Sequence, residues 1–151
     1  MLFLLEPEVA GGFGDNTIIE NFNNVRAKGE RPKVAHLHYE FMGWPDDEIL
    51  ERTPCFIVTE SLAKDIQKSS LNGYTFENVE ISKGDEFEEL YPNRDLPKFI
   101  RLIPNGFVEV VDDSYKEWSG DDFCMSQKSC LVVSERAFKM LKSHKLNYCE
   151  K

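Results

Sequence analysis

One stretch of the chain occurs twice. Residues 131–147 (LVVSERAFKMLKSHKLN) repeat residues 56–72 (FIVTESLAKDIQKSSLN) without a gap, so the offset from 56 to 131 is 75 residues. Each copy opens with a short β-branched run typical of a buried strand, and a hydroxyl residue followed by glutamate comes directly after it. A chain with this repeat has to accommodate the same strand-to-helix unit twice, which limits the possible folds.

The junction inside each copy has the signature of a helix N-terminus. Thr59 and Ser134 stand at the N-cap position, where a hydroxyl accepts a hydrogen bond from a free helix N–H and contributes about 1 kcal/mol. Glu60 and Glu135 follow in the first turn, where the helix dipole favours negative charge. Helix capping explains both pairs, so we assign neither a role as a catalytic nucleophile and its partner.

Apolar residues then recur at helical spacing, and Asn72-Gly73 and Asn147 are suited to end the two helices. Further β-rich runs lie at the N-terminus and at residues 34–44, 74–82 and 97–113, the last with an Asn105-Gly106 hairpin signal. We therefore predict an α+β fold, with a mixed or antiparallel sheet and two strand–cap–helix units packed on it. At 151 residues, the chain (1–151) is expected to form a single domain.

The run at residues 34–44 alternates in the manner of one strand, which places Val34, His36, His38 and Glu40 on one face. Two histidines at positions i and i+2 of a strand can bind a metal ion. They can equally lie on the wet face of a sheet, and no third ligand is evident. We therefore expect solvated histidines and predict no metal ligand here.

The net charge is −9, from 27 acidic and 18 basic side chains. Nucleic-acid binding depends on Lys and Arg that replace counterions on phosphates, so direct binding of DNA or RNA and of anionic membranes is disfavoured. An acidic protein associates faster with basic partners. Acidity also serves solubility alone, and both explanations remain open.

The N-terminal apolar run, Met1 to Leu5, is too short to cross a bilayer. No basic segment precedes it and Glu6 follows at once, so we expect no signal peptide and a cytoplasmic protein. Free thiols are then the default for the four cysteines, which form no CxxC pair. Cys124, Cys130 and His144 match no standard zinc spacing, and we predict no metal and no cofactor.

Two acidic segments carry the candidate binding residues: DEFEEL (85–90) and DDSYKEWSGDDF (112–123). Aromatic side chains rimmed by charge are typical of protein interfaces. Trp44 is expected in the core, whereas Trp118 fits a core position and an interface equally well. We predict no catalytic residues. The predicted partner-binding residues are Asp85, Glu86, Glu88, Glu89, Asp112, Asp113, Tyr115, Trp118, Asp121 and Asp122.

Several segments carry a resemblance to a known class of protein. They are DDF (121–123) followed by LVVSERAFKMLKSHKLNYCE, EPEVAGGFGDNT (6–17), LHYEFMGWPDDEIL (37–50) and EFEELYPNRDLP (86–97). The chain resembles small bacterial immunity proteins, the partners of polymorphic toxins, and a family of uncharacterised bacterial proteins that shares their C-terminal part. The resemblance covers most of the chain and implies a protein that binds and neutralises a cognate toxin. It brings no catalytic residues with it.

Three functions remain open at this point. The first is an immunity protein that covers a basic toxin domain with carboxylates that mimic phosphates. The second is a structural or regulatory module with another protein partner, including a second copy of itself. The third is a small hydrolase that uses carboxylates such as Glu86, Glu89, Asp112 or Asp122 for acid–base chemistry. We favour a binding protein over an enzyme.

Overall fold

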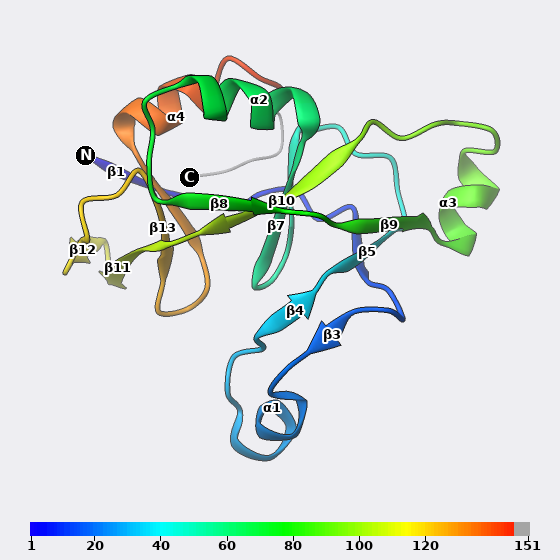
Figure 1. The fold of residues 1–151 in the computed structure, drawn as a ribbon, viewed down its shortest axis with the longest axis horizontal. Helices are drawn as coiled ribbons and strands as arrows, with labels where there is room; N and C mark the ends of the chain where they lie inside the picture. The colour runs from blue at the N-terminus through cyan, green and yellow to red at the C-terminus, as the bar shows by residue number, and fades with distance from the viewer. Residues whose placement is uncertain (147–151) are drawn as a thin grey trace.

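A computed structural model of the chain describes residues 1–146, so Asn147 and Cys149 lie outside the described residues. The protein is a mixed, β-rich α+β structure (Figure 1). The helices are α1 (Phe22–Lys28), α2 (Glu60–Lys68), α3 (Asp85–Leu90) and α4 (Glu135–Leu141). None of these described helices combines the length and apolar character that crossing a membrane requires.

The strands divide over several sheets, which differs from the single sheet that we predicted. The five-stranded sheet has the order β1-β14-β13-β11-β12, the four-stranded sheet β6-β7-β10-β8, and the smaller sheets β2-β5-β9 and β3-β4. The strands are β1 (Leu2–Leu5), β2 (Gly11–Phe13), β3 (Ile18–Ile19), β4 (Val34–His36), β5 (His38–Phe41), β6 (Ile49–Arg52), β7 (Cys55–Thr59), β8 (Tyr74–Glu77), β9 (Glu80–Lys83), β10 (Phe99–Pro104), β11 (Gly106–Val111), β12 (Ser114–Lys116), β13 (Phe123–Ser126) and β14 (Leu131–Ser134). Most pairs are antiparallel, while β11–β13 and β5–β9 are parallel.

The repeated segments form β7–α2 and β14–α4, and each strand pairs with the strand just before it, β6 or β13. Both predicted N-caps are confirmed. Thr59 Oγ1 accepts a hydrogen bond from the N–H of Leu62, and Ser134 Oγ accepts one from Ala137, each at 3.2 Å. The helices end at Lys68 and Leu141, earlier than the asparagines suggested.

Strands β7 and β14 are buried on both faces, and each lies in a different sheet. Phe56 and Val58 of β7 face one apolar cluster, while Ile57 faces a second. In β14, Leu131 and Val133 face that first cluster, and the buried faces of α2 and α4 cover it (Figure 1). The helices therefore share a core although their strands lie in different sheets.

A buried carboxylate anchors the second junction. Asp122 is only 3% exposed, and it was predicted to contact a partner. Its Oδ1 accepts hydrogen bonds from Ser134 Oγ (2.6 Å) and Arg136 Nε (2.7 Å). Its Oδ2 accepts from Arg136 Nη2 (2.6 Å) and the N–H of Asn72 (2.9 Å). Burial by itself raises the pKa of Asp122, but these donors hold it below its ordinary value.

Glu48 anchors the first junction in a corresponding way. Its Oε1 accepts from Thr59 Oγ1 (2.8 Å) and lies 3.0 Å from His144 Nδ1, while Oε2 accepts from the N–H of Lys145 (3.1 Å). His144 Nε2 lies 2.8 Å from Asp65 Oδ2 on α2. Burial by itself lowers the pKa of His144, but the two carboxylates raise it above its ordinary value.

Two further sequence expectations differ from the structure. Asn105-Gly106 is not a hairpin turn, because β10 and β11 lie in different sheets and neither residue has the positive φ of a type I′ turn. Gly106 is needed for space, since an added Cβ would lie 2.6 Å from the carbonyl oxygen of Phe123. The predicted strand at 34–44 breaks at the buried Leu37, and His38 is buried as well.

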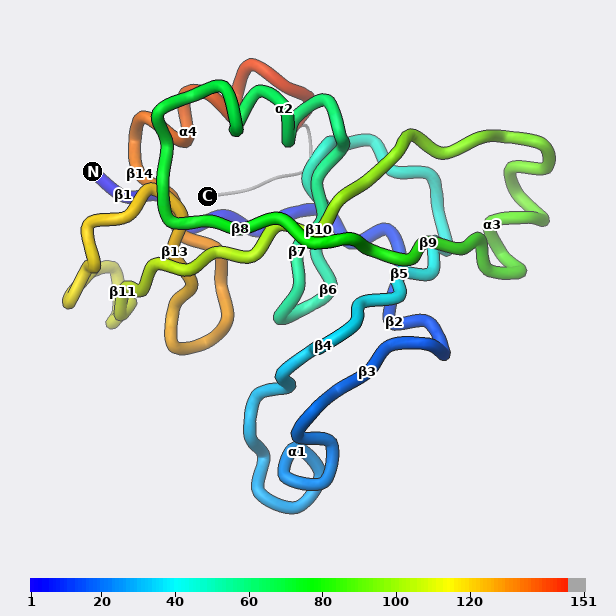
Figure 2. Tube along the Cα trace, in the orientation of Figure 1, coloured from blue at the N-terminus to red at the C-terminus, as the bar shows by residue number. Residues whose placement is uncertain are grey.

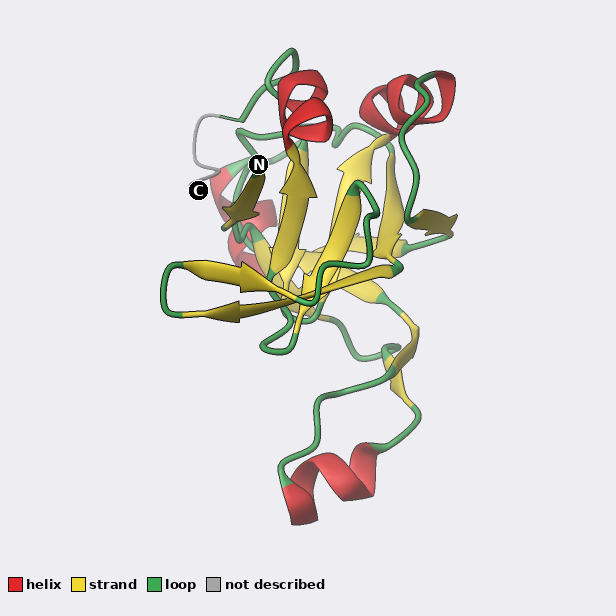
Figure 3. Cartoon of the chain, turned by 90° about the vertical axis from the view of Figure 1, so that its left-hand side faces the viewer, coloured by secondary structure: helices red, strands yellow, loops and turns green. Residues whose placement is uncertain are grey.

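A slender arm, residues 15–36, projects from the body of the molecule (Figures 2 and 3). It contains the β3–β4 pair and carries α1 at its tip. The polar sequence of residues 21–33, punctuated by glycine and proline, predicts only a surface connection there. No residue of α1 is buried. At its base, His36 Nε2 lies 2.9 Å from Glu80 Oε1. The Nδ1 atom of His38 accepts a hydrogen bond from the N–H of Asn16, so in the neutral ring Nε2 carries the proton and donates to Ser82 Oγ at 2.7 Å.

Replacement of the Asp122 anchor should destabilise the fold. We expect Asp122→Asn to lower the free energy of unfolding by about 2–3 kcal/mol, because Arg136 loses its carboxylate and a buried acceptor loses its charge. Urea unfolding measures the change. The control Asp113→Asn, at an exposed position, should stay within about 0.5 kcal/mol of the wild type. Equal unfolding midpoints for Asp122→Asn and Asp113→Asn would contradict the anchor role.

The His144 contacts should make stability depend on pH. Since the folded-state pKa is raised, their contribution is full below the unfolded-state pKa of about 6.5 and is lost as pH rises through the folded-state pKa. Thermal unfolding from acid to mildly alkaline pH should show this loss in the wild type and not in His144→Gln. The control His36→Gln should retain it; a wild-type profile without the loss would sink the idea.

Candidate functional site

The most prominent surface feature is a strongly acidic hairpin, defined here as residues 109–121. It consists of the end of β11, all of β12 and the segment that returns to β13. It holds five acidic residues and one lysine, a net charge of −4. Residues 111–120 are all exposed, an uninterrupted run of ten. The hairpin therefore presents backbone, charge and aromatic rings to solvent together.

Alternation along β11 explains why this segment is held at the surface. Val108 and Val110 face a small apolar cluster inside the five-stranded sheet, while Phe107 and Val111 on the opposite face are exposed. The chain then turns at Asp112, whose φ of 53° lies in the left-handed region that aspartate tolerates. The next strand, β12, is the last strand of its sheet.

Tyr115 connects the two edges of the five-stranded sheet. Its ring lies opposite Val110, and its hydroxyl accepts a hydrogen bond from the N–H of Leu4 at 3.1 Å. Leu4 belongs to β1, the strand at the other edge, so this bond shows that the sheet is curled. A cavity of about 370 Å³ opens beside it, lined by Leu4, Val110, Asp112, Asp113 and Tyr115.

The structure places Trp118 on the surface, where the sequence left two possibilities. Its side chain is 44% exposed, and its indole N–H donates to the carbonyl oxygen of Asp121 at 2.9 Å. Ser119 Oγ donates to the Asp121 carboxylate at 2.7 Å. The indole is thus oriented by its own loop and is not inserted into the core. Trp44, by contrast, packs against the core around Phe87 as expected.

The other predicted binding residues lie elsewhere. Helix α3 displays the exposed carboxylates, whereas its Phe87 is fully buried; the carboxylates are Asp85, Glu86, Glu88 and Glu89. Figure 1 shows α3 and β12 at opposite ends of the longest axis of the molecule. The two acidic segments therefore form separate surfaces, and Asp122 belongs to neither.

The carboxylates considered for hydrolase chemistry do not converge. Glu86 and Glu89 lie at one end of the molecule, Asp112 at the other, and Asp122 is buried in an ion pair. Within residues 1–146, no group of three His, Cys, Asp or Glu side chains is arranged to hold a metal ion.

Another pair of carboxyls comes closer to that chemistry, and the sequence did not single it out. Glu6 and Glu51 line a cavity of about 470 Å³. Burial raises the pKa of Glu51, and the charge of Glu6 adds to the effect. Glu6 itself is exposed.

A second feature that the sequence did not point to is a cluster of basic residues at the base of the arm. Arg31, Lys33 and Arg101 line one pocket, together with half-buried apolar side chains. A sequence signal existed, since four basic residues fall within residues 26–33 of an acidic chain. Their position was predicted only as a surface connection.

Comparisons with protein-family models, with curated proteins and with solved structures give no match for this chain. The resemblance to immunity proteins therefore stays a prediction.

Removal of the Tyr115 hydroxyl should loosen the curled sheet without unfolding it. We expect Tyr115→Phe to cost about 1 kcal/mol of stability, the usual contribution of one hydrogen bond. The amide hydrogen of Leu4 should exchange faster with solvent, which NMR measures at that residue. Tyr91→Phe is the control, because the Tyr91 hydroxyl bonds to no other described residue. Unchanged exchange at Leu4 would show that the hydroxyl does not hold the two edges.

Proposed function

We propose that the protein is a non-catalytic binding protein whose acidic hairpin contacts a basic protein partner, most concretely an immunity protein that neutralises a cognate bacterial toxin. The observation that carries this proposal is the exposed run 111–120, in which Tyr115 and Trp118 stand among carboxylates. Trp and Tyr are over-represented among the residues that dominate binding energy at interfaces.

Charge gives the hairpin a second property that suits such a role. Its net charge of −4 lies on one projecting element of a chain whose total is −9. Complementary charge steers encounter and raises association rates, more at low salt than at high salt. A toxin domain that acts on nucleic acid is expected to be basic, and carboxylates can occupy the positions of phosphates.

The packed interior is consistent with a rigid protein that presents the hairpin for binding. We infer that the two strand–cap–helix units act as a rigid scaffold, with each N-cap held by a carboxylate. A preorganised surface loses less conformational freedom on binding, which favours affinity. The hairpin is continuous with β11 and is joined to β1 through Tyr115, so it is presented in a defined orientation.

Helix α3 is the alternative acidic surface, and it is less suited to an anchored interface. Its exposed apolar residue is Leu90, at 65%, while the nearby Tyr91 is half-buried among Phe87 and Trp44. Charge without an aromatic anchor contributes more to encounter rate than to affinity. Variants of α3 therefore serve as the matched control for the hairpin.

The test is capture of a partner from the native host on the purified protein, followed by its affinity for defined variants. We expect one basic protein that is released as salt rises, and binding more than tenfold weaker for Asp112→Asn/Asp113→Asn/Trp118→Ala. The α3 variant Glu86→Gln/Glu89→Gln should bind as the wild type does. Both variants remove two charges, so a difference between them isolates the surface that binds.

Two outcomes would contradict the proposal. If neither variant weakens the captured complex, the partner uses another surface. If no host protein is retained on the purified protein at low salt, the acidic hairpin has no basic partner in that host.

A second candidate is a structural module that pairs with itself. The edge strand β12 leaves backbone groups on its outer side unpaired with another strand of its sheet, and exposed edges are sites of strand addition. Light scattering over a concentration series separates this from the main proposal, since self-pairing predicts dimers without any partner.

The hydrolase alternative now rests on Glu6 and Glu51. Their shared cavity and the raised pKa of Glu51 are the observations in its favour. The exposure of Glu6 argues against it, because acid–base pairs work best where water is excluded.

A further inference from the structure

A pocket of about 400 Å³ lies where the arm meets the body. It is lined by Glu20, Arg31, Pro32, Lys33, Val34, Pro54, Arg101, Ile103, Met125 and Ser129. The lining residues come from five separate stretches of the chain, so the pocket exists only in the folded protein. Its walls combine apolar side chains with three cationic groups, in a chain whose net charge is strongly negative.

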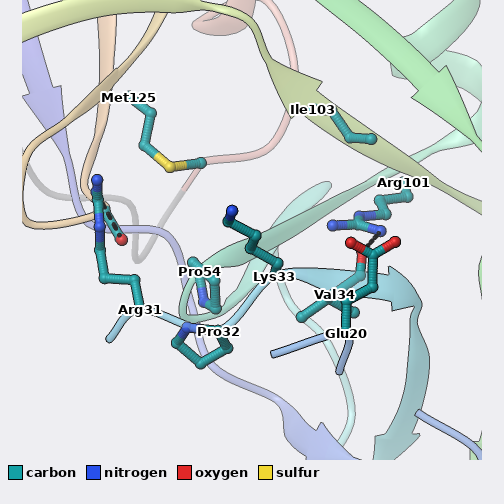
Figure 4. A pocket seen from close by; sticks show the side chains of 10 residues that line it. Glu20, Arg31, Pro32, Lys33, Val34, Pro54, Arg101, Ile103 and Met125 are labelled. Atoms are coloured by element: carbon teal, nitrogen blue, oxygen red, sulfur yellow. Dashed lines mark hydrogen bonds between the residues drawn. The ribbon is translucent and has the colours of Figure 1, made fainter. Parts of the chain in front are cut away.

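The three cations are held in different ways. Arg31 Nη1 donates to the carbonyl oxygen of Ser126 (3.1 Å) and to Ser129 Oγ (3.2 Å), which fixes the guanidinium against the body. Arg101 Nη1 donates to the carbonyl oxygen of Val34 at 2.9 Å. Lys33 lies between them in Figure 4, and its ammonium has no hydrogen-bond or ion-pair partner among residues 1–146.

One buried donor at this pocket is unsatisfied. Arg101 Nε is the single buried side-chain nitrogen or oxygen without a hydrogen-bond partner in the part of the chain that the structure describes. A buried donor left unpaired costs about 1–3 kcal/mol, more when it is charged. Arg101 also has a weak neighbour in Glu77, whose Oε1 lies 3.9 Å from Nη1. Nε itself is closed off from solvent, so a ligand would contact the guanidinium of Arg101 from the pocket and change the surroundings of this unpaired donor.

Long-range repulsion from the acidic chain does not prevent an anion from binding here. The Debye length at physiological salt is about 8 Å, so distant surface carboxylates such as those of α3 are largely screened. The residues that line the pocket carry three cations and one carboxylate, Glu20, which is exposed, and Glu77 lies beside Arg101. The local charge therefore stays positive. The nearest charges therefore favour an anion.

We propose that this pocket binds a small oxyanion, a phosphate- or carboxylate-bearing molecule whose apolar part contacts Val34, Ile103 and Met125. Arginine presents planar, multiple donors that match these groups, and lysine adds a flexible point charge. The ligand joins the arm, through Arg31 and Lys33, to Arg101 of β10. It thereby holds the arm against the body of the molecule.

Titration with millimolar inorganic phosphate, pyrophosphate and citrate tests the proposal on the whole chain. The Nε–Hε resonance of Arg101 in a ¹H–¹⁵N spectrum is the reporter, because Arg101 lines the pocket and its Nε has no hydrogen-bond partner among residues 1–146. We expect it to shift on binding. A shift with the phosphates alone assigns a phosphate ligand, and a shift with citrate alone assigns a carboxylate.

Lys33 supplies the decisive variants, since its ammonium has no partner among residues 1–146 to lose on substitution. We expect Lys33→Gln to weaken binding about tenfold, equivalent to about 1.4 kcal/mol. Lys33→Arg should retain it. Lys139→Gln on α4 removes the same charge away from the pocket and should bind as the wild type does.

Two results would overturn the proposal. The first is an Arg101 resonance that none of the three probes shifts. The second is equal weakening by Lys33→Gln and Lys139→Gln, which would show only a general effect of charge. Neither result bears on the acidic hairpin, whose test depends on a protein partner.

Discussion

Two carboxylates, Glu48 and Asp122, hold the rest of the structure in place. Each accepts a hydrogen bond from the hydroxyl that caps one helix, and each also accepts a backbone N–H from the segment that leaves the other helix. Asp122 thus joins the start of α4 to Asn72 beyond α2, while Glu48 joins the start of α2 to Lys145 beyond α4. Neither strand–helix unit can shift without breaking bonds of the other, which couples two sheets that share no hydrogen-bonded strands.

This coupling leaves other parts of the chain free to project. The core is formed by the inner strands and by the buried faces of α2 and α4, which pack against one another. The hairpin beyond Val110 and the arm that carries α1 contribute little to it. An isolated helix as short as α1 is marginal in water, so the arm depends on contacts at its base. Those contacts include Arg31 and Arg101, the residues that also line the basic pocket.

The sequence predicted the features that depend on neighbouring residues and missed those that depend on contacts between distant parts of the chain. The caps at Thr59 and Ser134 were predictable because a cap is decided within a few residues. The hairpin predicted at Asn105-Gly106 was wrong. Gly106 is required there because the backbone of Phe123 comes close to it, and not because the pair forms a turn. Asp122 was grouped with its half-buried neighbour Asp121 because the sequence shows how many charges there are and not where they lie. Its partner Arg136 comes 14 residues later, within the second copy.

The same limitation explains the surface. The sequence shows a net charge of −9 and two acidic segments but not their positions, and the folded chain places these charges at two separate ends with a basic pocket elsewhere. Since screening confines electrostatic effects to about 8 Å at physiological salt, each surface acts through its own residues and not through the total. The surface around Trp118 is acidic and suits a basic protein, whereas the pocket around Lys33 is basic and suits an anion. The two proposals, a protein on the acidic hairpin and a small anion in the basic pocket, are therefore compatible with each other and can be tested separately.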